Sequence, residues 1–267
     1  MLLADAFDHV VDSHRIDIFE SLGWSIHLPF GLTKFMVLEL VAAGLILAIF
    51  IPMAKRAQSG EPPRGWFANA FESLLTFIRE RVAKPAVGDH DADTFVPLLW
   101  TVFLFVLFCN LLGIIPFLGS PTASFAVTGA LAVVAFVVIH GAAIVKMGFG
   151  HYARAHYPHV EAPFGMGPVI AVMIVAIEVF GHFIKAFVLA VRLFANLFAG
   201  HLVLAFILTF IVMARHVHWS LLGVISVGSV AMVVALSLLE IFVAFLQAFI
   251  FTYLTALFLG TALHPQH

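Results

Sequence analysis

The sequence predicts an all-α integral membrane protein with about five membrane-embedded helices, one interfacial amphipathic helix and a long tilted helical hairpin at the C-terminal end. Of the 267 residues, 63% are hydrophobic and only 10% are charged, whereas soluble domains average about 25% charged residues. Several apolar stretches reach the ~20 residues that a spanning helix needs. A net charge of −2 gives no basis for binding nucleic acid, and the lone cysteine excludes an internal disulfide.

The first third of the chain combines one span with a basic segment. Residues 1–33 are polar and acidic, and we expect a tail outside the bilayer without a cleavable signal peptide. Residues 34–53 form the first predicted span. Residues 54–93 hold six Lys and Arg residues, so the positive-inside rule places this segment in the cytoplasm. Within it, residues 66–84 have apolar side chains at helical spacing and predict an interfacial helix that ends at Pro85.

Two further spans follow, joined by a short uncharged turn. Residues 95–117 form the second predicted span and residues 122–145 the third, and residues 146–168 form a cytoplasmic loop. Asn110 is expected to make a structural hydrogen bond between helices. The predicted inner loops carry eight Lys and Arg residues and the outer segments three, which places the N-terminus outside and the C-terminus in the cytoplasm.

Some polar residues give only weak functional signals. Glu39 lies in the first span, where a carboxylate at the headgroup level and a functional role both remain open. His151, His156 and His159 share the cytoplasmic loop, but no carboxylate or cysteine joins them at ligand spacing. We therefore predict no metal site.

Residues 169–262 are predicted to form the long hairpin. The segment contains no proline, and only the polar patch at 214–220 interrupts its apolar character. Each helix would be roughly 65–70 Å long, about twice the hydrocarbon thickness, so each must tilt, bend or leave the bilayer. Hydropathy alone would divide the first helix into two spans, and the residue pattern leaves this alternative open.

Arg192 lies within the apolar stretch VLAVRLFANLFAGHLVL, residues 188–204. A charge at the bilayer centre costs about 2.5–3.5 kcal/mol on insertion scales, and such residues face a protein interior or a water-filled cavity. Glu178, Lys185, Arg192 and Asn196 are spaced by 7, 7 and 4 residues. This spacing puts all four within ~40° on one helix face, with His201 on the opposite face.

The second hairpin helix carries Glu240 and Gln247, which are seven residues apart and share a face. A pair between His201 and Glu240 would centre the turn near residue 220, and a pair between Arg192 and Gln247 would centre it at almost the same position. One antiparallel hairpin therefore accommodates both pairs at the end of the polar patch.

Two interpretations of these polar residues remain open. They can simply hold two helices together, or they can carry protons. Glutamate and histidine act in proton relays within membranes, and histidine titrates near physiological pH. Arginine does not release its proton, so Arg192 would act as a fixed positive charge.

At these residues the sequence resembles subunit a of the F-type ATP synthase. The segment VRLFANLFAGHLVL, residues 191–204, is similar to a pattern around the family's essential arginine, at Arg192. The segment LLEIFVAFLQAFIFTYLTALFLG, residues 238–260, is similar to the family's C-terminal run. Asn110 with two following leucines and the PTAS stretch at 121–124 support the resemblance, which covers residues 95–262.

The resemblance implies a membrane stator that turns a ring of c subunits by proton flow through two offset half-channels. Arg192 would separate the half-channels and contact the ring carboxylate. The implied proton pathway comprises Asn196, His201, Glu240 and Gln247 on the outer side and Glu178 on the inner side; Lys185 matches in position and is assigned only a structural polar role. The order His201 then Glu240 is reversed in some bacterial members, which leaves the chemistry of the pair unchanged.

The implied partners are the c-subunit ring, the b-subunit peripheral stalk, other ATP synthase subunits and membrane lipid. No cofactor is expected. The chain has no phosphate-binding loop, so ATP would be made on partner subunits and this chain would have no catalytic site of its own. A bacterial plasma membrane is favoured over a mitochondrion.

Two other classes compete with the stator. An ion-coupled secondary transporter also uses intramembrane charges, but it typically shows internal repeats and interrupted helices, which are not apparent here. A redox enzyme with histidine-bound haem or metal would need paired histidines, whereas His140, His182 and His201 show no pairing pattern.

Overall fold

The structure is a computed structural model. It describes residues 15–19, 24–27, 33–58, 65–115, 121–150, 152 and 219–263, together with scattered residues between 173 and 207 that include 190–195 and 197–200. The chain divides into two compact units. The first unit comprises Met1–Glu61, Leu104–Thr128 and Arg192–Phe249, and the second comprises Pro62–Phe103, Gly129–Val191 and Ile250–His267.

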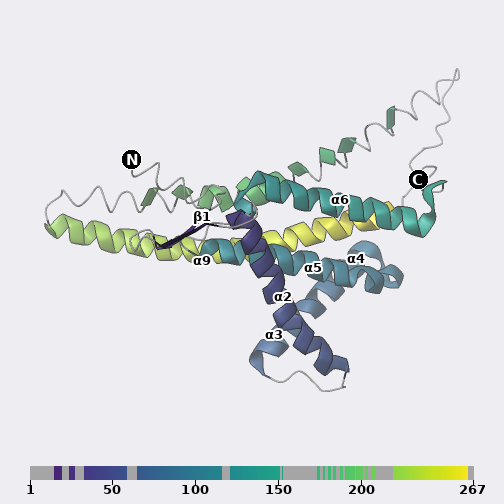
Figure 1. Cartoon of the computed structure of the whole chain (residues 1–267). Coiled ribbons are helices and arrows are strands. Elements are labelled where there is room, and N and C mark those ends of the chain that lie inside the picture. Colours follow the sequence, from purple (N-terminus) through teal and green to yellow (C-terminus); the bar gives the residue numbers. More distant parts are fainter. Residues whose placement is uncertain are drawn as a thin grey trace. The chain divides into compact units, whose positions relative to one another are not determined.

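Four helices in the described part of the chain are long and apolar enough to cross a membrane. They are α2 (Lys34–Gln58), α5 (Asp89–Ile114), α6 (Phe125–Met147) and α9 (Trp219–Leu263). The 45 residues of α9 form one continuous helix about 67 Å long, seen from green to yellow in Figure 1. Helices satisfy their own backbone hydrogen bonds, as a bilayer requires, and the predicted all-α membrane class is confirmed.

The N-terminal segment contains two short strands that the sequence analysis did not predict. Strand β1 (Arg15–Phe19) pairs antiparallel with β2 (Trp24–His27), with Ile16 opposite Ile26. Apolar and polar residues alternate in β2 and over residues 15–18 of β1, which is the pattern of a two-faced ladder, and the register shifts between Asp17 and Phe19. The ladder is too short to alter the helical class of the membrane segments.

The interfacial helix continues past the proline that was expected to end it. Helix α3 (Trp66–Ile78) passes into the π-helix η3 (Arg79–Ala83) and then into α4 (Lys84–Val87), with Pro85 in the first turn of α4. The wider π turn lets the Lys84 amide donate to the Arg79 carbonyl, and proline is tolerated at a helix start because its missing N–H needs no partner there. The helix ends instead at Gly88, where φ is 94°.

Direct bonds hold the interfacial helix to α5 within the second unit. The indole Nε1–H of Trp100 donates to the Leu75 carbonyl at 2.9 Å. Arg79 forms two hydrogen bonds with Asp93, at 2.7 and 2.8 Å, and these bonds raise the pKa of its guanidinium above the ordinary value. Acidic residues in the first turn of α5 also suit the positive end of that helix dipole.

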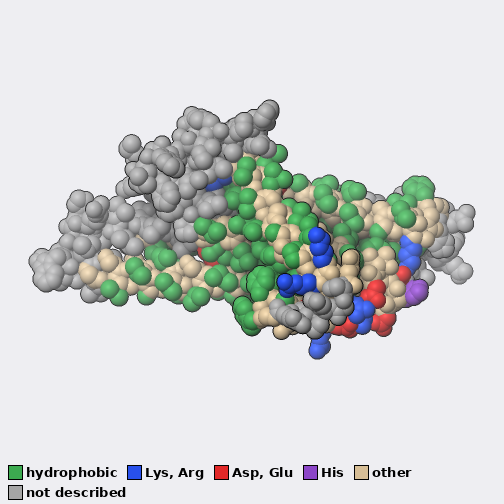
Figure 2. Space-filling model, turned by 60° about the horizontal axis from the view of Figure 1, so that its bottom comes forward, with side chains coloured by type: hydrophobic (Ala, Val, Ile, Leu, Met, Phe, Trp, Pro, Cys, Tyr) green, Lys and Arg blue, Asp and Glu red, His purple; other side chains and the backbone are tan. Residues whose placement is uncertain are grey.

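The last turns of α9 pack closely on α4. A Cβ on Gly260 would overlap the Ala86 carbonyl oxygen and would lie 2.9 Å from its carbonyl carbon. Only glycine therefore fits at this crossing. Figure 2 shows hydrophobic side chains over much of the visible described surface, with most of the visible acidic and basic side chains gathered in one region. An apolar surface of this kind suits lipid contact.

Candidate functional site: the helix of Arg192 and the facing segment of α9

The apolar helix Ala190–Gly200 presents Arg192 on its exposed side. Leu193 and Leu197 are buried, with 1% and 6% of their surfaces exposed, whereas Ala195 and Ala199 are exposed. Residues three and seven positions after Arg192 lie on its own helix face. Arg192 therefore lies on a face lined by small side chains, and leucines fill the opposite face.

Aromatic contacts help to fix this helix within the first unit. The rings of Phe194 and Phe198 stack with centroids 5.3 Å apart, and Phe194 meets Phe125 edge to face at 6.1 Å. Phe125 is the first residue of α6. Such aromatic pairs contribute about 0.5–1.5 kcal/mol beyond the area they bury, so they help to set the rotation that leaves Arg192 exposed.

Glu240 of α9 lies directly against Gly200. An ideal Cβ built on Gly200 would be 2.6 Å from Glu240 Oε1 and 3.4 Å from its Cδ. The other carboxylate oxygen, Oε2, is buried and accepts no hydrogen bond from any residue that the structure describes. Gly200 precedes His201, the predicted partner of Glu240, and His201 itself lies outside the described residues.

The Gly200–Glu240 contact also bears on the register of the hairpin. These two residues are equidistant from residue 220, and α9 begins at Trp219. The predicted pairing of His201 with Glu240 placed the turn centre at nearly the same residue. The described helices therefore meet at Gly200 and Glu240, one residue from the predicted pair.

Asn110 connects three elements of the first unit through buried hydrogen bonds. Its Nδ2 donates to the Ala244 carbonyl of α9 at 3.3 Å, and its Oδ1 accepts from Thr122 Oγ1 at 2.8 Å. Thr122 belongs to the 3₁₀ turn η4 (Pro121–Ala123). Ala244 is one helical turn after Glu240, so this hydrogen-bond chain meets α9 beside the candidate site.

The remaining predicted site residues divide into two groups. Gln247 is half-buried on α9, and among the described residues it forms no hydrogen bond with Arg192. Glu178, Lys185, Asn196 and His201 lie outside the described residues. The sequence analysis assigned no role to Gly200 or Thr122. Both positions lie in motifs that it used only for the family resemblance, residues 191–204 and the PTAS stretch at 121–124.

Of the three histidines that the redox alternative considered, His140 is the one that lies among the described residues. No group of three His, Cys, Asp or Glu side chains suited to a metal ion occurs among the described residues. The His140 ring, which the redox alternative needed, has its Nδ1 at 2.6 Å from the Tyr152 hydroxyl and packs edge-on against Phe136.

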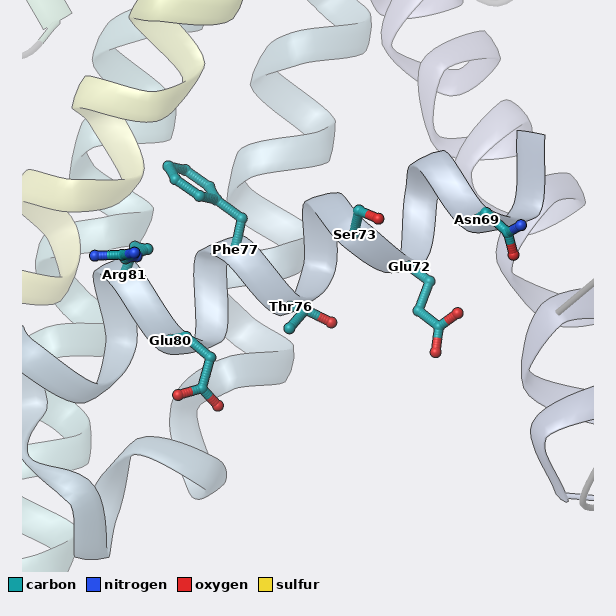
Figure 3. Close-up of a pocket in the computed structure, with 7 residues that line it drawn as sticks. All are labelled: Asn69, Glu72, Ser73, Thr76, Phe77, Glu80 and Arg81. Carbon is teal, nitrogen blue, oxygen red and sulfur yellow. The ribbon is translucent and has the colours of Figure 1, made fainter. Parts of the chain in front are cut away.

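A separate polar groove of about 520 Å³ lies along the interfacial helix. Figure 3 shows Glu72, Thr76 and Glu80 projecting from the same side of this helix, opposite to the fully buried Ile78. The groove is lined by Asn69, Glu72, Ser73, Thr76, Phe77, Glu80 and Arg81. It contains none of the residues predicted for proton transfer.

Together, the apolar spans and the polar residues within them define a multi-pass α-helical membrane protein with ionisable residues in its apolar helices. A family model described as ATP synthase A chain matches residues 36–260, so the chain belongs to this family. It is 38% identical to ATP synthase subunit a of Chloroherpeton thalassium over 98% of this chain and 78% of that protein. It is also 38% identical to ATP synthase subunit a of Myxococcus xanthus (90% and 75%) and to ATP synthase subunit a 2 of Chlorobaculum tepidum (95% and 71%).

Proposed function

We propose that this chain is the proton-translocating stator subunit of the ATP synthase membrane sector, with two offset half-channels that serve a rotating c-ring and Arg192 between them. Family membership supports the general role. The observation that carries the finer proposal is the exposed face formed by Arg192, Ala195 and Ala199, which offers a fixed positive charge beside a path for close helix approach.

Arg192 would act on the ring carboxylate that passes it. A nearby positive charge favours the ionised form of a carboxylate and lowers its pKa, so a ring carboxylate would release its proton before it reaches Arg192. Small residues let membrane helices approach closely, and Ala195 and Ala199 provide such positions one and two turns along the same face. A permanent cation would also repel a proton that moved directly between the half-channels.

The two half-channels would use the polar residues on either side of Arg192. Glu240, held against Gly200, would exchange protons with His201 in the outer half-channel, with Asn196 and Gln247 lining it. Glu178, fourteen residues before Arg192, would serve the inner half-channel. Histidine suits this exchange because it titrates near physiological pH. Glutamate and histidine also act together in the proton relays of membrane proteins.

The proposed setting is a bacterial plasma membrane with the N-terminus outside and the C-terminus in the cytoplasm. The other ATP synthase subunits would include the c-ring against the Arg192 face and a b-subunit peripheral stalk. ATP synthesis itself would take place on those partner subunits, since this chain carries no phosphate-binding loop.

The test is ATP-driven proton pumping in inverted membrane vesicles that contain the whole complex. Arg192→Ala is expected to abolish pumping while the complex still assembles, and Arg192→Lys is expected not to restore it fully because a lysine places its charge differently. Arg81→Ala, which removes an exposed arginine from the interfacial helix, is the matched control and should pump normally. Normal pumping by Arg192→Ala would overturn the stator mechanism.

A further inference from the structure

A buried hydrogen-bond chain links the turn before α6 to the middle of α9. Thr122, Asn110 and Ala244 are all nearly inaccessible, with 1%, 0% and 1% of their surfaces exposed. The Ala244 carbonyl can only accept a hydrogen bond, so the Asn110 NH₂ group must face it. The Asn110 oxygen then faces the opposite way, where the Thr122 hydroxyl donates to it at 2.8 Å.

This chain meets α9 between the two polar residues of the proposed outer half-channel. Ala244 follows Glu240 by four residues and precedes Gln247 by three, so all three positions lie on adjoining parts of one helix face. A sliding or turning movement of α9 at Ala244 would therefore displace both polar side chains together.

The chemistry of the contact makes it sensitive to position. Ala244 and Ala248 are the buried α9 residues around this contact, and their small side chains fix the level of the helix less strongly than large interlocking side chains would. A buried amide that loses its partner keeps the full cost of desolvation, since no lipid group can replace that partner. A movement of α9 that carried the Ala244 carbonyl away from Asn110 would lengthen or break this hydrogen bond.

We propose that Thr122 is a positioning residue for proton transfer. Its hydroxyl orients the Asn110 amide, and that amide holds α9 at the level where Glu240 and Gln247 serve the outer half-channel. This inference rests on the proposed function, because a level of α9 matters for conduction only if protons pass those residues.

The test compares Thr122→Val, which removes the hydroxyl at nearly constant volume, with Thr122→Ser, which keeps it. The control is Thr128→Val, which removes another fully buried threonine hydroxyl that donates to carbonyls of its own helix turn, Ser124 and Phe125. Passive proton conduction is measured in vesicles and divided by the amount of assembled complex, and its dependence on the pH of the outer side is recorded.

We expect Thr122→Val to lower conduction per complex roughly fivefold, as the loss of one typical hydrogen bond would do to the population of the aligned state. The midpoint of the pH profile should also move, because Glu240 and its predicted partner His201 would no longer keep their spacing. Thr122→Ser and Thr128→Val should stay within about twofold of the native chain with an unchanged midpoint.

Three results would overturn the proposal. Native conduction and midpoint in Thr122→Val would show that the hydroxyl does not position α9. Equal losses in Thr122→Val and Thr128→Val would show a general packing effect. Failure of both Thr122→Val and Thr122→Ala to assemble would make Thr122 a folding residue. The two proposals fail independently. If Arg192→Ala stops pumping while Thr122→Val behaves like the native chain, the stator function stands and the positioning role of Thr122 is refuted.

Discussion

Replacement of Gly200 with alanine would displace the Glu240 carboxylate while leaving the rest of the hairpin in place. The new Cβ would lie 2.6 Å from Oε1, and real Cβ atoms essentially never come closer than 3.0 Å to another heavy atom, so Oε1 must move by at least about 0.4 Å. Cδ and Cγ of Glu240, at 3.4 and 3.6 Å, stay in ordinary contact. Only the end of a flexible side chain has to yield.

The free energies indicate that the change is nearly neutral for folding. A side-chain torsion about 30° away from its rotamer costs about 0.5–1.5 kcal/mol, and alanine gains about 1 kcal/mol over glycine inside a helix. The two terms nearly cancel. For proton transfer the consequence is larger, since good hydrogen bonds span only about 2.7–3.2 Å and a 0.4 Å shift consumes most of that range.

We therefore expect Gly200→Ala to reduce ATP-driven proton pumping roughly tenfold at an unchanged amount of complex in the membrane, a barrier change of about 1.4 kcal/mol. Gly228→Ala is the matched control, because this position lies in the same helix as Glu240 and no described atom comes within 4 Å of a Cβ placed there. Native pumping by Gly200→Ala would refute the reasoning, since it would mean that the position of the Glu240 carboxylate does not limit proton flow.

The other two predictions concern the second unit and folding rather than proton transfer. Gly260→Ala should lower the amount of subunit in membranes, measured by immunoblot, because a backbone carbonyl cannot move aside and overpacking costs about 1–3 kcal/mol; a native amount would contradict the close crossing. Trp100→Phe should lower the thermal midpoint of the detergent-solubilised complex through loss of one hydrogen bond worth about 1 kcal/mol, with pumping per complex unchanged. An unchanged midpoint would show that this bond contributes nothing.

The membrane class and the family were predictable because they depend on local sequence. A stretch such as residues 34–53 indicates its environment by composition alone, and the family resemblance rests on short motifs around Arg192 and Gln247. The level of Glu240 relative to residue 200 also came close to the expectation from spacing, because the level of two residues in an antiparallel hairpin depends only on their distances from the turn.

Features that depend on distant contacts were not predictable in this way. The sequence predicted an interhelical hydrogen bond for Asn110, but its partners Thr122 and Ala244, the latter 134 residues away, become visible only in the structure. Gly200 looks like any glycine in an apolar helix until the Glu240 carboxylate is seen against it. The passage of the interfacial helix through Pro85 depends on a π turn, which the spacing of apolar residues does not indicate.

The exposed position of Arg192 is compatible with the role proposed for it. Within the described residues Arg192 forms no hydrogen bond or ion pair, and it lies on an exposed face of an apolar helix. An arginine that held two helices of this chain together would lie on the buried side, where Leu193 and Leu197 are found. The insertion cost of about 2.5–3.5 kcal/mol must be offset by an anion or by water beside that face. In the proposed stator, a carboxylate on a moving ring would meet this requirement each time it passed Arg192.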